Sequence, residues 1–272
     1  MLTRFYVKIK NMTRFLKFAL ETSKQAGNVL YKSFRKGDPV KRGTSKEVKS
    51  VYDIISDEII KKAIEKNFPT HSYVTEETGW VKKDKKYLWV IDPMDGTSNL
   101  ENHNPFFSVS IALWVDGKPA LGVIEAPALG ERYYAISGKG AYRIDLLRHK
   151  KVKAKVSENK NISKSFFVFC EGGEKKKERT KKIFDSMYPK MKEFRKLGSA
   201  ALELAWVGTG RAEGYVTTGI NFWDIGAGLI FVKEAGGKIL KFNGKQYDLS
   251  EFEPLGKYDL AATNGKIKMG KL

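Results

Sequence analysis

The chain has 272 residues, 42% of them hydrophobic, which is enough to bury a large core in one domain or two closely joined halves. Fifty Lys and Arg residues against 31 Asp and Glu give a formal net charge of +19, which attracts anions without naming one. The single cysteine, Cys170, excludes an internal disulfide, and no apolar run approaches the roughly 18 residues of a membrane span.

Composition also sets expectations about location and partners. Residues 1–11 form a short basic extension without the apolar segment of a signal peptide, so we expect a cytoplasmic protein with no membrane partner. Enrichment in Lys and Glu is typical of heat-adapted organisms. A nucleic-acid partner is not expected, because no basic stretch carries interleaved aromatic residues and no zinc-finger spacing occurs.

Two amphipathic helices are predicted in the first part of the chain. Apolar residues recur at three- and four-residue spacing from Arg14 to Phe34, and a basic loop follows at Lys36–Lys49. A second helix should run from Ser50 to Asn67. Its predicted inward residues are Ile54, Ile55, Ile59 and Ala63, and two acids four residues apart, Asp53 and Asp57, share one face.

Strands dominate the next part. Ser72–Val74 and the apolar run Tyr87–Ile91 are typical of buried strands, the latter ending at Asp92, and a meander of antiparallel strands should follow over 106–136. The rest alternates strands and helices. The expected elements are a strand at 165–170 containing Cys170, helices at 174–187 and 199–207, a strand at 214–216, a helix at 224–235 and a strand at 238–240. This order predicts an α+β half at 12–150 and an α/β half at 151–272, joined by a linker around 145–161 and packed as one unit.

The densest chemistry lies in the segment Asp92-Pro93-Met94-Asp95-Gly96-Thr97-Ser98-Asn99, where a buried strand ends. Two carboxylates three residues apart, with the Met94 carbonyl between them, can bind one or two divalent cations that prefer oxygen ligands. Gly96 lets the backbone come close to a ligand, and the amides of Gly96 and Thr97 would bind a phosphate if a helix begins there.

This segment has three other interpretations. An EF-hand is excluded because Met94 occupies the third position of the loop and no Glu occupies the twelfth. A phosphatase that forms an aspartyl-phosphate needs two aspartates separated by one residue, whereas two separate Asp92 from Asp95. The acids could also simply cap a turn at Asp95-Gly96, since Asp-Gly is a common turn sequence.

Further acids at similar junctions weaken the turn interpretation. Glu76-Glu77-Thr78-Gly79 follows one predicted strand, and Trp223-Asp224-Ile225-Gly226-Ala227-Gly228 begins an apolar helix. Alone, Asp224 is better explained as the N-cap of that helix. Together, the three segments resemble the inositol monophosphatase family, which includes archaeal-type fructose-1,6-bisphosphatases, with the similarity running from about Met12 to Leu240.

The resemblance implies a layered αβαβα sandwich of the fructose-1,6-bisphosphatase-like type, usually a homodimer, with two or three Mg²⁺ ions per subunit, or Mn²⁺. It implies that Glu76, Asp92 and the Met94 carbonyl hold one metal, and that Asp92, Asp95 and Asp224 hold another. The implied catalytic residues are Thr97, which orients water, Asp53, with Asp57 as the alternative, and Glu76. The implied substrate-binding residues are Asp95, Gly96, Thr97, Gly198, Ser199 and Ala200, with Arg195 as a possible second phosphate contact.

One departure concerns the substrate. Thr217 stands where several inositol monophosphatases carry a Glu that binds substrate hydroxyls, so strict specificity for inositol 1-phosphate is in doubt. The expected activity is Mg²⁺-dependent hydrolysis of a small sugar or polyol phosphate, inositol 1-phosphate or fructose 1,6-bisphosphate or both, by direct attack of a metal-activated water. The alternatives are a phosphatase of 3′-phosphoadenosine 5′-phosphate or another nucleotide, or a non-catalytic protein that binds phosphate or nucleic acid.

Overall fold

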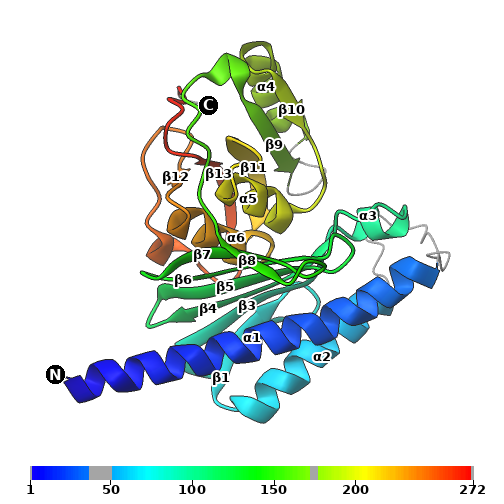
Figure 1. Ribbon diagram of the computed structural model, residues 1–272, viewed down its shortest axis with the longest axis vertical. Coiled ribbons are helices and arrows are strands. Elements are labelled where there is room, and N and C mark those ends of the chain that lie inside the picture. The colour runs from blue at the N-terminus through cyan, green and yellow to red at the C-terminus, as the bar shows by residue number, and fades with distance from the viewer. Residues whose placement is uncertain (1, 37–50, 172–176, 271–272) are drawn as a thin grey trace.

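A computed structural model describes residues 2–36, 51–171 and 177–270 of the chain (Figure 1). Two β-sheets alternate with three layers of helices. Helices α1 (Leu2–Lys36) and α2 (Val51–Asn67) cover one face of the first sheet. Helices α5 (Ala200–Gly208) and α6 (Phe222–Glu234) lie between the two sheets, and α4 (Lys177–Met187) packs on the second sheet. The predicted αβαβα sandwich is therefore confirmed.

The first sheet has the strand order β2-β1-β3-β4-β5-β6-β7-β8, and only the β1–β3 pair is parallel. Its strands are β1 (His71–Thr75), β2 (Gly79–Val81), β3 (Asp84–Asp95), β4 (Ser108–Val115), β5 (Lys118–Ala126), β6 (Glu131–Ile136), β7 (Gly140–Asp145) and β8 (Lys150–Lys153). A short helix, α3 (Thr97–Glu101), begins two residues after β3 ends. A helix start at this position is the condition for the Gly96 and Thr97 amides to bind a phosphate.

The second sheet has the order β10-β9-β11-β13-β12. Its strands are β9 (Phe166–Glu171), β10 (Glu193–Arg195), β11 (Gly214–Asn221), β12 (Lys238–Leu240) and β13 (Lys257–Thr263), and single 3₁₀ turns lie at η1 (Ile162–Lys164), η3 (Tyr188–Lys190) and η4 (Leu249–Glu251). β9 pairs in parallel with β10 and β11, whereas β13 runs antiparallel to β11 and β12.

Successive side chains of β3 point into two different cores, as strand geometry requires. Trp89 and Ile91 lie in the apolar cluster beneath α1 and α2. Val90 lies between them in sequence but belongs to the cluster beneath α5 and α6. Because both faces of the strand are covered, its sequence is continuously apolar, and Asp92 is the first buried acid that follows.

The predicted inward face of α2 is wrong at two positions. Ile54 and Ile55 are 50% and 40% exposed, whereas Asp53, Ser56 and Asp57 are buried together with Ile60 and Ile64. The acids therefore face the sheet, and two large apolar residues face outward. The hydroxyl of Ser56 donates a hydrogen bond of 2.7 Å to the Pro93 carbonyl, so this polar face supports the turn that carries Asp92 and Asp95.

Several element boundaries also differ from expectation. The helix predicted to start at Arg14 begins at Leu2, and β3 continues past Asp92 to Asp95 with a register shift against β4. β11 runs on to Asn221, and β13 was not predicted. β8 lies in the predicted linker and adds a strand to the first sheet, so the division at residue 150 stays a prediction.

Two expectations fall partly outside the described residues. Most of the basic loop Lys36–Lys49 does so, as does the start of the helix expected at 174–187, which is described from Lys177 onward. Within the described ranges, no helix combines the length and the apolar character needed to cross a lipid bilayer.

The contact between β5 and α6 gives a test of how tightly the layers pack. A Cβ at Gly122 would lie 2.8 Å from both Cα and the carbonyl oxygen of Ala227, which are backbone atoms that cannot rotate away. We predict that Gly122→Ala lowers the free energy of unfolding by about 1–3 kcal/mol. Chemical denaturation measures it, with Gly270→Ala, where nothing lies within 4 Å, as the neutral control. An unchanged midpoint for Gly122→Ala would contradict the close packing.

Candidate active site

Three carboxylates from distant parts of the chain converge at one end of the first sheet. Glu76 follows β1, Asp92 lies near the end of β3, and Asp224 lies in the first turn of α6. Each offers an oxygen within 4.8 Å of the others, an arrangement that could hold a metal ion. Asp92 is buried, Asp224 is partly buried and Glu76 is exposed, so the group opens toward solvent on the Glu76 side.

Local hydrogen bonds orient the two inner acids. One oxygen of Asp92 accepts the Met94 amide at 3.0 Å, inside the turn formed by the β3 register shift. One oxygen of Asp224 accepts the amide of Asn221 at 3.1 Å and its side-chain Nδ2 at 3.3 Å. Asn221 is thus the N-cap of α6 and Asp224 is the third helical residue, which corrects the N-cap interpretation of Asp224.

Asp95 occupies a different environment, at the N-terminus of α5. Its buried carboxylate accepts the Ala200 amide at 3.0 Å, the Ala201 amide at 2.8 Å, and the hydroxyls of Ser199 and Ser108. Asp95 therefore lies against two of the residues predicted to line the substrate, Ser199 and Ala200. It is not one of the three acids whose oxygens converge.

Two glycine turns meet beside Asp95. Gly96 and Gly198 have φ angles of 94° and 85°, in the left-handed region that favours glycine. A Cβ on Gly96 would lie 3.2 Å from the Gly198 carbonyl oxygen, so the two backbones approach too closely for a side chain. Asn99 Nδ2 donates hydrogen bonds of 2.7 Å to the carbonyls of Leu197 and Phe106, which fixes the two turns against each other.

Sequence reasoning missed Glu203, which binds the backbone of the turn at Leu197 and Gly198. Its Oε1 accepts the amides of Leu197 at 2.8 Å and Gly198 at 3.1 Å, and the residue is fully buried. The available signal was its isolation, since it is the only charged residue in α5. Asn99 was part of the quoted motif, but no role was predicted for it.

The remaining predicted residues are placed as follows. Thr97 Oγ1 donates to the buried Met94 carbonyl at 3.3 Å, and Asp53 is buried on α2. Asp57 accepts the Thr78 hydroxyl at 2.8 Å and lies 3.2 Å from Lys61 Nζ. Arg195 is exposed on the edge strand β10 and pairs with Glu193, so its proposed phosphate contact stays a prediction.

Comparison with known proteins decides the family. The model of the inositol monophosphatase family matches residues 11–269. The chain belongs to the inositol monophosphatase family. It is 37% identical to a Thermotoga maritima protein named fructose-1,6-bisphosphatase/inositol-1-monophosphatase, over 85% of this chain and 86% of that one. It is 35% identical to a Pasteurella multocida protein named Nus factor SuhB, covering 86% and 87% of the two chains. The solved structure of a Thermotoga maritima IMPase superposes with a TM-score of 0.79 at 34% identity, covering 93% of each chain.

Burial, reinforced by neighbouring like charges, dominates the electrostatics of this inositol monophosphatase family site. Burial raises the pKa of Asp92 well above its usual value, and the nearby charges of Glu76, Asp95 and Asp224 raise it further. Burial and two of the same neighbours raise the pKa of Asp224. Burial raises the pKa of Asp95 to about 6, although the donors from Ser199 and the α5 backbone favour its ionised form. A divalent cation would relieve this repulsion, so the donor set fits a hard metal.

This crowding predicts how the metal-free protein responds to pH. A carboxyl group whose pKa is raised by folding stabilises the protein only while protonated, so its contribution is lost as the pH rises above about 4. In EDTA, we predict that Asp224→Asn raises the melting temperature at about pH 8 by at least about 2 °C, and by less at about pH 5. In excess magnesium, the unmodified protein should instead have a higher melting temperature than Asp224→Asn.

Differential scanning fluorimetry at both pH values measures these shifts. The matched control is Asp116→Asn, at an exposed hairpin position with a φ of 51° that Asn adopts readily. A melting-temperature difference for Asp224→Asn that does not change with pH would show that Asp224 carries no crowding penalty.

Proposed function

We propose that this protein is a Mg²⁺-dependent phosphomonoester hydrolase of a small sugar or polyol phosphate. The observation that carries the proposal is the convergence of the oxygens of Glu76, Asp92 and Asp224 from three separate elements. Membership of the inositol monophosphatase family supports hydrolysis of a phosphate ester, and the Thermotoga relative is named for two such activities.

Metal binding is assigned to these acids together with two neighbours. In this proposal, Glu76, Asp92 and the Met94 carbonyl hold one Mg²⁺, and Asp92, Asp95 and Asp224 hold a second; Mn²⁺ could replace either. Bound Mg²⁺ would supply an activated water and stabilise charge on the leaving oxygen. Asp95 Oδ2 already accepts hydrogen bonds from Ala201 and two serines, whereas Oδ1 accepts only the Ala200 amide. We therefore assign Oδ1 as the Asp95 metal ligand.

The protein's own groups position the water and the phosphate. The Thr97 hydroxyl, which donates to the Met94 carbonyl, is the group proposed to orient the attacking water. In this proposal, Asp53 or Glu76 accepts the proton that the water gives up. Gly96 lets the backbone approach closely enough for the Gly96 and Thr97 amides to donate to phosphate oxygens. No covalent intermediate with the protein is required.

Substrate hydroxyls would meet the turn formed by Gly198, Ser199 and Ala200. Asp95 and Glu203 hold this turn through backbone amides, so its shape is set before substrate arrives. At the neighbouring strand, Thr217 is buried and its hydroxyl has no hydrogen-bond partner among the described residues. A short hydroxyl in place of a Glu favours broad specificity for inositol 1-phosphate and fructose 1,6-bisphosphate.

Two other functions are alternatives to this proposal. A nucleotide such as 3′-phosphoadenosine 5′-phosphate would use the same metal chemistry. Several bacterial relatives are named Nus factor SuhB, and the net charge of +19 would suit a phosphate- or nucleic-acid-binding protein. The converging carboxylates favour hydrolysis, because an anion-binding protein gains nothing from clustered negative charge.

A phosphate-release screen separates these functions. The substrates are inositol 1-phosphate, fructose 1,6-bisphosphate and 3′-phosphoadenosine 5′-phosphate, each with and without magnesium. We expect magnesium-dependent release from at least one of the first two. Strong salt-dependent binding to RNA or duplex DNA, with no hydrolysis of any of the three, would support the non-catalytic alternative.

Glu76 gives the cleanest test of the metal site. Asp95→Asn keeps only one acceptor oxygen and would leave one of the two α5 amides facing an NH2 group, so this variant should lose stability together with turnover. Glu76 is exposed, and we predict that Glu76→Gln lowers kcat/KM at least about a hundredfold while the melting temperature in EDTA is not lowered, because the substitution removes a charge that repels Asp92 and Asp224. The control is Glu58→Gln, which removes a half-buried acid of α2 that is not in the carboxylate group. Full activity of Glu76→Gln in saturating magnesium would refute the metal assignment.

Thr97 tests the positioning of water. Because its hydroxyl is assigned to orient the nucleophile and not to bind substrate, Thr97→Val should lower kcat about a hundredfold with little change in KM. Thr97→Ser retains the hydroxyl and should keep most of the activity. Steady-state kinetics on both variants measures the difference, and equal losses in the two would rule out the hydroxyl as the cause.

A further inference from the structure

A second candidate binding site lies at the opposite end of α5 from Asp95. A hollow of about 230 Å³ is lined by Arg143 of β7, by Lys153 and Lys155 at the end of β8, and by Thr209 and Arg211 just after α5. Because α5 spans Ala200–Gly208 at about 1.5 Å per residue, its length separates the hollow from the carboxylate site. Neither the family motifs nor the proposed mechanism uses these residues.

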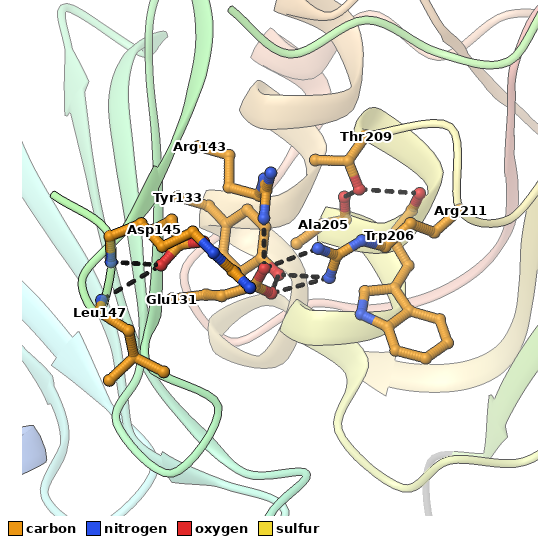
Figure 2. Close-up of polar contacts among 10 residues, drawn as sticks. Glu131, Tyr133, Arg143, Asp145, Leu147, Ala205, Trp206, Thr209 and Arg211 are labelled. Atoms are coloured by element: carbon orange, nitrogen blue, oxygen red, sulfur yellow. Dashed lines mark hydrogen bonds and ion pairs between the residues drawn. The ribbon is translucent and has the colours of Figure 1, made fainter. Parts of the chain in front are cut away.

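The two arginines are held in place by one buried carboxylate. Glu131 accepts hydrogen bonds from Arg143 Nη1, Arg211 Nη1 and Arg211 Nη2 at 2.5, 2.7 and 2.6 Å, and from the Tyr133 hydroxyl (Figure 2). Figure 2 shows the two guanidinium groups converging on this carboxylate, with Trp206 beside Arg211. The arginines are therefore ordered before any ligand binds, which reduces the entropy cost of binding.

The same contacts leave positive charge and donors unused. Glu131 supplies one negative charge to two guanidinium groups. A guanidinium has five N–H donors, and the recorded hydrogen bonds of Arg143 use one of them, whereas those of Arg211 use three. Fork-shaped guanidinium groups with free donors match phosphate oxygens in geometry and charge.

Two lysines add to this field, Lys153 at the end of β8 and Lys155 two residues beyond it. Lys155 pairs with Glu158 at 2.8 Å, but both side chains are more than half exposed, so the pair holds the lysine weakly. For Lys153, no ion pair is recorded within the described part of the chain. Its Cε would lie 3.3 Å from a Cβ at Gly140, so the side chain rests against that glycine at the edge of the hollow.

Thr209 indicates what else the ligand carries. Its hydroxyl donates to the Ala205 carbonyl at 2.9 Å, at the end of α5, and therefore presents only acceptor capacity to the hollow. The carboxyl end of α5 also contributes partial negative charge there, which a ligand hydroxyl would tolerate better than a second anionic group. The volume is below the roughly 300–1,000 Å³ of sites for drug-sized ligands, so the occupant is small.

We infer that this hollow binds the phosphoryl group of a small phosphorylated metabolite, with the arginines and Lys153 on the phosphate and Thr209 accepting from a hydroxyl of the ligand. Free inorganic phosphate shares the recognised chemistry. The site is separate from the carboxylate group and does not require hydrolysis.

Binding is measured on the full chain in EDTA at constant ionic strength, by equilibrium dialysis with inorganic phosphate and with glucose 6-phosphate. Without metal, the clustered carboxylates repel both probes, so the hollow is the site under test. We expect both to bind, glucose 6-phosphate more tightly because it adds hydroxyls. Lys153→Gln should weaken each about tenfold, the loss expected for one charge-assisted hydrogen bond, and Lys153→Glu should weaken them further.

The matched control is Lys160→Gln, which removes an exposed lysine outside the hollow with the same change of charge. We expect its affinities to stay within twofold of the unmodified protein. If Lys153→Gln and Lys160→Gln weaken probe binding equally, the loss comes from net charge alone, and the assignment is overturned. Failure of both probes to bind would also overturn the assignment. This holds even if an RNA oligonucleotide binds and Lys153→Gln weakens the binding of that RNA.

Discussion

The hydrogen bonds that Asp95 accepts are the interaction on which the site depends. This carboxylate ends β3 in the first half of the chain and accepts two backbone amides at the start of α5 in the second half, from residues 105 and 106 positions away. An anion at a helix N-terminus is favoured by the partial positive charge there. The same anion lies close enough to Asp92 and Asp224 to raise their pKa values. Asp95 therefore joins the halves and contributes to the repulsion that a metal would relieve.

The two glycine turns beside Asp95 add further contacts between the same two segments of the chain. Gly96 and Gly198 bring two backbones together, and Asn99 and Glu203 saturate the amides and carbonyls that this approach buries. Glu203 is itself a buried acid whose pKa is raised by burial, and its bonds to two amides offset part of that cost. These hydrogen bonds are directional, so they specify the relative position of the segments that they join more strictly than apolar packing alone.

Much of the fold and of the candidate site could be predicted from sequence, because the acids stand in short ordered motifs beside buried strands. Glu76, Asp92 and Asp224 were found in this way, and their convergence is seen in the structure. What could not be predicted depends on contacts between distant segments. Nothing near Asp95 in the sequence indicates that its donors come from α5.

Helix α2 shows the same limit in a different form. Its apolar periodicity favoured Ile54 and Ile55 as inward residues, but the helix is rotated so that Asp53, Ser56 and Asp57 face the sheet. Burying acids in place of isoleucines opposes the hydrophobic effect, so another interaction must compensate, and the Ser56 bond to the Pro93 carbonyl and the Thr78 bond to Asp57 lie on that face. Local periodicity fails in the first turns of α2 because they face a polar site, whereas Ile60 and Ile64 further along face the apolar core. Such a failure is expected where function requires buried charge.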